Sequence, residues 1–257
     1  MILRLLTALF LLLATTATAQ EEKPGIQIGL SEEVVEISSS FSGTEIIIFG
    51  SIENGIAEDL KAGLYDVVVV LEGPRELVTV RRRERKLGIW VNGTARDFID
   101  VPSSYSVAST KPFSQITDAE DARILQIGLE NLSFRPVDGG IGDPLNAEFA
   151  ASVKRLKTDK DLYLERPGGI SFLTPSLFKA RLAVPANVPI GRHTARAFMF
   201  HKGKFVESQF LPLTVKKIGF EQFTYDFAHQ YGFWFGIICV IVAAFTGWLA
   251  SVVFRKN

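Results

Sequence analysis

One stretch constrains this chain more than any other: the apolar, uncharged run from Gly232 to Phe254. As an α-helix it would be roughly 35 Å long, enough to cross a hydrocarbon core of about 30 Å. A helix of that length in a soluble core would normally keep one polar face. We therefore predict a transmembrane helix over 232–254. Arg255 and Lys256 follow directly, and positive charge at the end of a span favours the cytoplasmic side.

The N-terminus agrees with this topology. Arg4 precedes a short apolar run, Leu5 to Ala14, and Ala17-Thr18-Ala19 then gives the small-x-small pattern of a cleavage site. We predict a signal peptide over 1–19, with an uncleaved anchor as the alternative. The chain is then a single-pass protein of the bacterial inner (cell) membrane. Its N-terminal region would be periplasmic, and residues 255–257 would form a cytoplasmic tail.

Composition limits the cellular compartment and the kinds of binding partner that we expect. The single cysteine, Cys239, lies inside the predicted span, so the exported part has no cysteine with which to form a disulfide. Small secreted eukaryotic domains often depend on disulfides, and their absence favours a bacterial periplasm. The formal net charge is +0, which gives no overall attraction to nucleic acid. We expect contact with the lipid bilayer and no nucleic-acid partner.

The first part of the exported region reads as β-structure. Apolar residues alternate over Thr44–Ile52, and Leu64–Leu71 is a continuous β-branched run that suits a central strand covered on both faces. Asn92-Gly93 is a tight-turn signal between two later strands. Short strands at such spacing predict a mainly β fold, an immunoglobulin-like β-sandwich over 20–112, with a barrel as the alternative. The later strands are expected at 76–82, 87–91, 96–99 and 105–109.

The periodicity then changes twice. Thr117 and Glu120 form a capping box before a helical pattern, and Asp143-Pro144 begins a second helix, so 113–162 is predicted as a two-helix insertion. A second β segment follows over 163–217 and packs on the rest, with a hairpin turn at 201–204. Whether the two β segments make one composite domain or two stays open. An aromatic juxtamembrane helix is expected over 218–231.

Two groups of residues are candidate sites. Arg81, Arg83 and Arg85 fall on alternate positions of a strand and would form a cationic row that could hold an anion; the alternative is a solvated edge strand. Small residues recur at four-residue steps in the predicted span, where they would let two helices approach closely, although such residues are common in spans. This candidate helix-packing face comprises Gly232, Gly236, Cys239, Ala243, Gly247 and Ser251.

Catalytic and metal motifs do not stand out. His193 and His201 would lie about 26 Å apart on one straight strand, too far to share a metal ion. The sequence has no Gly-x-Ser-x-Gly elbow, His-Glu-x-x-His helix or phosphate-binding glycine loop. We expect no catalytic residue, no metal site and no cofactor.

The layout as a whole resembles a known family. The signal peptide, the β-rich region, the stretch VRRRERKLGIWVNGTARDFIDVPSSYSVASTKPF and the C-terminal span are similar to an uncharacterised alphaproteobacterial family of transmembrane proteins. The basic cluster leading into Leu87–Asn92 is the most specific part of this resemblance. It implies a location but no reaction, and it assigns no functional residue.

These observations favour a non-enzymatic protein. The first hypothesis is a membrane-anchored interaction or accessory module for another membrane or periplasmic protein, or for a second copy of itself. The alternative is a periplasmic receptor for an anion or small ligand that uses the Arg81–Lys86 cluster. The third hypothesis, which these observations favour least, is an enzyme of the cell envelope.

Overall fold

The computed structural model describes residues 23–38, 41–86, 88–140, 142–218, 225 and 227–254. The predicted signal peptide, the cytoplasmic tail and much of the juxtamembrane segment lie outside these residues; within that segment, 227–230 are helical. The elements are, in order, β1 (Gly25–Leu30), β2 (Val34–Ile37), β3 (Thr44–Glu53), α2 (Ala57–Lys61), β4 (Tyr65–Glu72), β5 (Arg75–Lys86), β6 (Ile89–Pro102), β7 (Tyr105–Ser109), α3 (Phe113–Ile116), α4 (Ala119–Ile124), β8 (Arg135–Pro136), α5 (Pro144–Thr158), β9 (Tyr163–Pro167), β10 (Ile170–Phe172), β11 (Leu177–Val184), β12 (Gly191–His201), β13 (Lys204–Lys217) and α7 (Gly232–Phe254).

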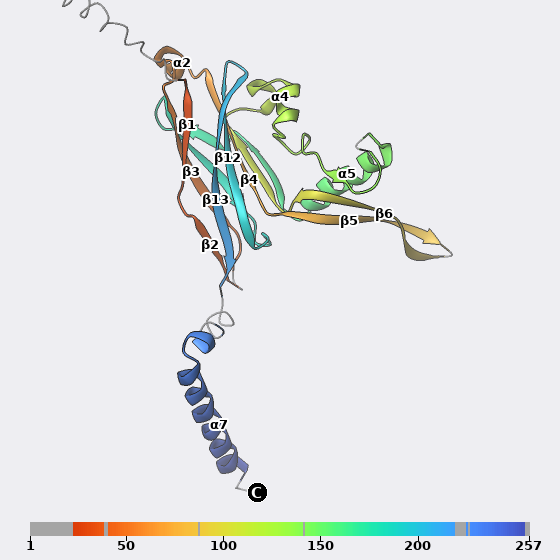
Figure 1. Ribbon diagram of the computed structural model, residues 1–257, viewed down its shortest axis with the longest axis vertical. Helices are drawn as coiled ribbons and strands as arrows, with labels where there is room; N and C mark the ends of the chain where they lie inside the picture. The colour runs from red at the N-terminus through yellow and green to blue at the C-terminus, as the bar shows by residue number, and fades with distance from the viewer. Residues whose placement is uncertain are drawn as a thin grey trace, which may run out of the picture.

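Two sheets make up the sandwich seen in Figure 1: a 4-stranded sheet in the order β1-β3-β11-β10 and a 6-stranded sheet in the order β2-β13-β12-β4-β7-β9. The first has the A-B-E-D order of an immunoglobulin domain, and the second contains the G-F-C-C′-C″ order of the variable type. The strand β7 pairs with β9 in parallel, because the helical insertion between them supplies the long crossover that parallel strands need. The predicted immunoglobulin-like fold is confirmed.

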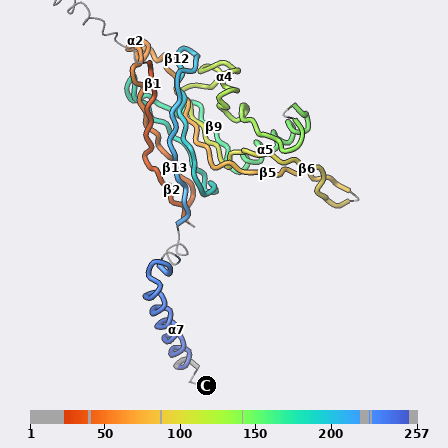
Figure 2. The backbone as a smooth tube through the Cα atoms, in the orientation of Figure 1, coloured from red at the N-terminus to blue at the C-terminus, as the bar shows by residue number. Residues whose placement is uncertain are grey.

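The two β segments form one composite sandwich, which answers the question left open by the sequence. The late strand β11 pairs with the early strand β3, and β12 pairs with β4. Figure 2 shows the N-terminal strands in red beside the C-terminal strand β13 in blue. The predicted turn over 201–204 is confirmed: Lys202 and Gly203 have φ of 51° and 84°, as a two-residue turn of type I′ requires.

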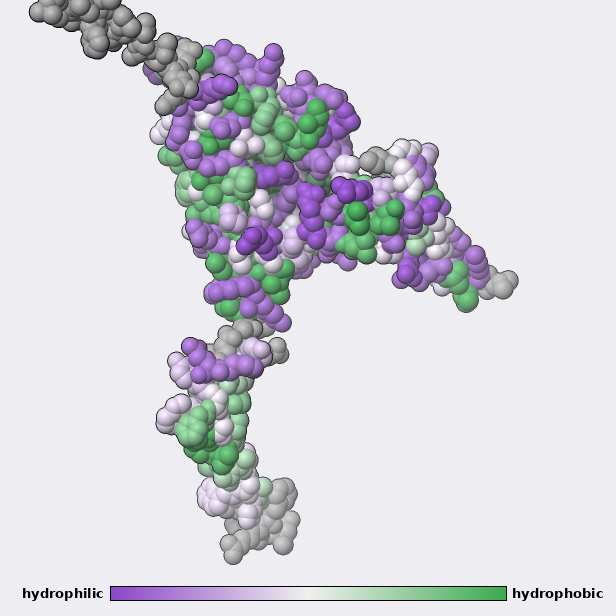
Figure 3. Space-filling view, viewed as in Figure 1, coloured by the Kyte–Doolittle hydropathy of each residue, from purple (hydrophilic) through white to green (hydrophobic). Residues whose placement is uncertain are grey.

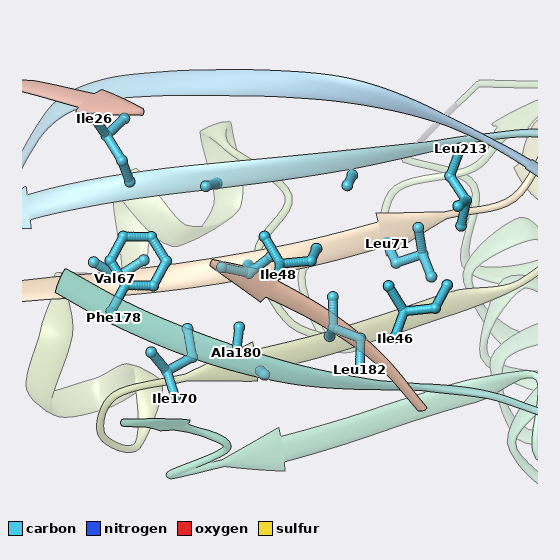
Figure 4. Close-up of a cluster of buried hydrophobic side chains, with 14 of the residues drawn as sticks. Ile26, Ile46, Ile48, Val67, Leu71, Ile170, Phe178, Ala180, Leu182 and Leu213 are labelled. Atoms are coloured by element: carbon cyan, nitrogen blue, oxygen red, sulfur yellow. The ribbon is translucent and has the colours of Figure 1, made fainter. Parts of the chain in front are cut away.

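The main core lies between the sheets (Figure 4). On β3, Ile46, Ile48 and Ile52 are buried, as their alternation predicted. Gly50 shares that face, and a Cβ there would collide with the ring of Phe178, so this position holds the ring by lacking a side chain. Every residue of β4 is buried, because one face packs in this core and the other in a second core beneath the helices.

The helical insertion is present but begins differently from the prediction. The cap of α4 is Asp118, whose Oδ1 accepts a hydrogen bond of 2.8 Å from the backbone N–H of Asp121; the capping box of Thr117 and Glu120 was wrong. The helix also ends early, because Gln126 adopts a φ of 53°. The cap of α5 is as predicted: Asp143 accepts from the N–H of Leu145. A one-turn helix, α3, precedes both.

Residues 75–102 leave the sandwich as a long hairpin, which we call the arm; with β8 it forms a 3-stranded sheet (Figure 1). The sequence placed these strands inside the sandwich, because the same alternation suits a hairpin in either position. The predicted turn at Asn92-Gly93 was also wrong. These residues lie within β6, where the pairing shifts register, and the chain reverses between Lys86 and Ile89, where Gly88 has a φ of 86°.

Candidate functional site

The base of the arm is fixed to the helical insertion. Val80 and Phe98 of the arm share the second core with Phe149 of α5. The ammonium of Lys157, also on α5, lies 2.5 Å from Glu76 Oε1 and donates to the carbonyl of Ser103 at 3.1 Å. Buried side chains and these polar contacts therefore hold the inner half of the arm in one orientation.

The free end of the arm exposes two large apolar side chains. Ile89 is 65% exposed and Trp90 is 68% exposed. They lie opposite Lys86 and Arg85 on β5. Figure 3 shows a hydrophobic patch near the end of an otherwise mostly hydrophilic arm. An exposed tryptophan contributes little to the stability of a fold, so burial does not explain why Trp90 occupies this position.

The three arginines singled out in the sequence share one face of the arm. Arg81, Arg83 and Arg85 occupy alternate positions of β5 and are exposed, and none of them forms an ion pair with another described residue. At about 3.3 Å per residue the row is roughly 13 Å long. Arg82 faces the other way: its guanidinium lies 2.5 Å from Glu148 Oε1 and 5.5 Å from the ring centre of Phe149.

Sequence reasoning missed Trp90 and Ile89 as site residues. The signal was present: two large apolar residues follow directly on a basic cluster and a glycine in the stretch RRRERKLGIW. It was hidden because a strand inside a sandwich would bury one of the two side chains. Only the departure of the hairpin from the sandwich exposes both.

The six small residues predicted as a packing face all lie on α7 and are exposed. A Cβ at Gly232, Gly236 or Gly247 would meet no heavy atom within 4 Å in the described part of the chain. The helix is long and apolar enough to cross a membrane over Gly232–Ser251. The hydroxyl of Thr246 donates to the carbonyl of Val242 at 2.9 Å, which satisfies this polar group inside the helix. The packing face itself stays a prediction.

The histidines lie apart, each with its own partners. His193 is 1% exposed, and its Nε2 lies 3.3 Å from Ser104 Oγ; burial lowers the pKa of this imidazole. The adjoining cavity of about 10 Å³ has room for about one water molecule. His201 contacts Asp59 Oδ2 at 2.8 Å. Among the described residues, no group of three or more His, Cys, Asp or Glu side chains is placed to hold a metal ion.

The chain was compared with curated proteins, solved structures and protein families. No curated protein matches the chain. Among solved structures, it is similar to AggA, the major subunit of aggregative adherence fimbriae type I from Escherichia coli, at 10% identity. That match covers 76% of this chain and 95% of the fimbrial chain, with a TM-score of 0.23. The family described as "Putative transmembrane protein (Alph_Pro_TM)" matches residues 25–256, which include the sandwich, the arm and α7. The chain belongs to this family of transmembrane proteins.

Proposed function

We propose that this protein is a non-enzymatic, single-span inner-membrane protein whose periplasmic sandwich serves as an interaction or accessory module for another membrane or periplasmic protein. The observation that carries the proposal is the free end of the arm. There, Ile89 and Trp90 are exposed next to a row of arginines, none of which forms an ion pair within the part of the chain that the structure describes. Aromatic residues and arginine are the side chains enriched at the energetic centres of protein interfaces.

The arm suits this role because it is extended yet anchored. Contacts of Glu76, Val80 and Phe98 with α5 and the second core fix its base, so little conformational freedom remains to be lost when its end meets a partner. The arginine row selects for a partner with an acidic surface. Charge complementarity of this kind speeds encounter and sets the register of an interface.

The alternative, a receptor for a small anion, fits the geometry less closely. Arg81, Arg83 and Arg85 lie along an exposed two-stranded ribbon. A small anion held there would stay largely hydrated, and hydration weakens charge-assisted hydrogen bonds. A row roughly 13 Å long matches an extended acidic surface better than a single anion.

The topology is part of the proposal and has its own test. We expect a reporter enzyme that is active only in the periplasm to be active when fused after Ser109 or Val215, and silent after Asn257. The basis is the apolar helix α7 followed by Arg255 and Lys256. Activity of the fusion at the C-terminus would reverse the orientation and place the arm in the cytoplasm.

Site-specific cross-linking tests the arm. A photo-reactive phenylalanine analogue replaces Trp90 in the full chain in its native membrane, and the matched control carries the analogue at Phe210, which is 70% exposed on β13. We expect a protein adduct from position 90 and none from 210. Arg83→Glu, which reverses one charge of the row, should reduce that adduct. Identical adducts from both positions, or none from position 90, would contradict the proposal.

A further inference from the structure

The outer half of the arm contains a length of strand that is paired on one side only. There β6 pairs with β5, while the short strand β8 reaches the other side of β6 only at the base, at Phe98 and Ile99. Within the part of the chain that the structure describes, nothing pairs with that side of residues 89–94. All six are uncharged, in the order Ile-Trp-Val-Asn-Gly-Thr. We call residues 89–94 the free edge; the carbonyl of Ala95, which follows, already accepts a hydrogen bond of 3.0 Å from Arg96.

The other border strands of the described sheets are short or protected. On β1, the N–H groups of Ile26 and Ile28 donate to the side chains of Glu207 and Gln209 at 3.2 and 2.6 Å. The strand β2 has 4 residues, β10 has 3, and β9 ends at Pro167. On the arm, β5 carries a run of basic side chains. Proteins use such devices to prevent strands of different molecules from pairing, and the free edge has neither a charge nor a proline.

The turn at the end of the arm determines which backbone groups the free edge offers. Lys86 and Ile89 flank a two-residue turn, and the backbone groups of such a flanking pair point toward each other. Because the direction alternates along a strand, the N–H and C=O groups of Trp90 and Asn92 point away from β5. The pairing register shifts just after Asn92. The regular part of the free edge is therefore Ile89–Asn92, which offers its outward donors and acceptors to a short added strand.

The arginine row lies on the same face of the arm as two side chains of the free edge. Trp90 lies opposite Arg85, and Asn92 lies opposite Arg83. A strand added beside β6 would lie two strand spacings, or roughly 10 Å, from β5. Arginine and glutamate side chains together reach across that distance, so acidic residues of an added strand would meet the arginines. On the opposite face, the exposed side chain of Ile89 would contact apolar residues of the same strand.

We propose that the arm binds its partner by strand addition: an extended segment of the partner, in which acidic and apolar residues alternate, pairs with Ile89–Asn92 of β6. This inference rests on the proposed function and adds the recognition mode and the chemistry of the partner. In strand addition, main-chain hydrogen bonds supply affinity and alternate side chains supply specificity. A second copy of the chain fits less well, because edge-to-edge pairing of two arms would bring two basic clusters, Arg81–Lys86, close together.

Peptide binding tests the recognition mode on the full chain in lipid nanodiscs. The probe is a fluorescein-labelled peptide, Thr-Val-Glu-Val-Glu-Val-Thr, whose fluorescence anisotropy is measured at low salt. The control peptide has lysine in place of glutamate. We expect the acidic peptide to bind, more weakly as the salt concentration rises, and the lysine peptide not to bind. Failure of the acidic peptide to bind, or equal binding of the two peptides, would overturn the proposal.

Two substitutions at one position isolate the backbone hydrogen bond. Asn92→Pro removes an N–H group from the free edge and leaves the pairing with β5 in place, whereas Asn92→Ala changes the side chain and keeps the N–H group. We expect the proline variant to bind the acidic peptide at least about fivefold more weakly than the alanine variant, with the same midpoint of thermal unfolding. Arg83→Gln, which leaves the backbone of the free edge unaltered, should also weaken binding and reduce its salt dependence. Equal affinities of the two Asn92 variants would overturn strand addition.

The cross-link from position 90 in the native membrane separates this inference from the proposed function. Loss of the adduct with Asn92→Pro but not with Asn92→Ala would support strand addition. The same adduct from both variants would overturn strand addition and leave the proposed function standing, because the partner would then contact side chains alone. An adduct with twice the mass of the chain would assign the free edge to a second copy and overturn the acidic partner. No adduct from the parent would contradict the proposed function and this inference together.

Discussion

Two consecutive strands of this chain have opposite environments. All residues of β4 are buried, with one core on each face. After Gly73-Pro74 the chain continues as β5, most of whose residues are exposed. The sandwich needs β4 as its centre, whereas the outer half of the arm adds nothing to either core. The comparison indicates that packing on both faces constrains every residue of β4, whereas the outer half of β5 is free of that constraint, as the proposed interaction role requires.

The sharpest test of this contrast truncates one aromatic residue in each region. Phe178→Ala empties the centre of the sandwich and should lower the free energy of unfolding by about 3–5 kcal/mol. Trp90→Ala should change it by less than about 0.5 kcal/mol, because the ring is exposed. Urea unfolding of the full chain in detergent, followed by its β-sheet circular dichroism, measures both. A large loss with Trp90→Ala would mean that the arm is part of the folded core.

Glycine positions sharpen the comparison inside the sandwich. Gly50→Ala should cost about 1–3 kcal/mol, because the new methyl group would collide with the ring of Phe178. Gly29→Ala is the matched control on the neighbouring strand β1, where an added Cβ meets nothing within 4 Å. The same unfolding assay applies. Equal effects of the two substitutions would show that an added methyl group at position 50 meets no special obstacle at Phe178.

A pH series tests the burial of His193. Burial lowers the pKa of His193, while the unfolded chain keeps the ordinary value of about 6.5. Below about pH 6.5 the unfolded chain therefore takes up a proton that the folded chain resists, so stability should fall as the pH falls. The contribution is at most about 1.4 kcal/mol per pH unit. His193→Gln should flatten this part of the profile between pH values of about 7.5 and 5.5, and an unchanged slope would contradict the assignment.

The smallest expected effect distinguishes the two faces of the arm. Arg82 pairs with Glu148 and lies over Phe149, so Arg82→Gln should cost about 0.5–1 kcal/mol. Arg83→Gln, one residue along on the opposite face, should leave stability unchanged while weakening the cross-link from position 90. Thermal unfolding and the cross-linking assay together separate a structural arginine from a recognition arginine. Equal destabilisation by both would mean that the arginine row is structural.

Much of the fold could be predicted from local patterns. The alternation over β3 and the β-branched run of β4 follow from which side chains of each strand are buried. The cap of α5 follows from a hydrogen bond between residues two positions apart. The departure of the arm could not be predicted, because an alternating hairpin has the same pattern inside or outside a sandwich. The cap of α4 could not be predicted reliably, because Thr117 and Asp118 are adjacent and both are good N-cap residues. Tertiary packing decides between them: it buries Thr117 and leaves Asp118 as the cap.

Some features of the candidate sites could also be predicted from local sequence patterns, and others depend on the tertiary structure. The arginine row followed from the two-residue period of a strand and is present on β5. Trp90 was missed because its exposure depends on where the hairpin goes. A surface groove between α4 and β9 brings Thr117 together with Glu165, which lies on β9 beyond the whole of α5. This arrangement depends on the parallel pairing of β7 with β9, and no local pattern in the sequence encodes that pairing.

The composite sandwich also has a consequence for how the chain is made. The strand β4 pairs with β12, and β2 pairs with β13, so the centre of the larger sheet stays unpaired until the last strands have been synthesised. Until then β4 presents an apolar strand with one free edge, which is the kind of segment that aggregates. The nascent protein therefore exposes this edge of β4 until β12 has been made. Its folding can finish only when the residues just before the membrane helix have emerged.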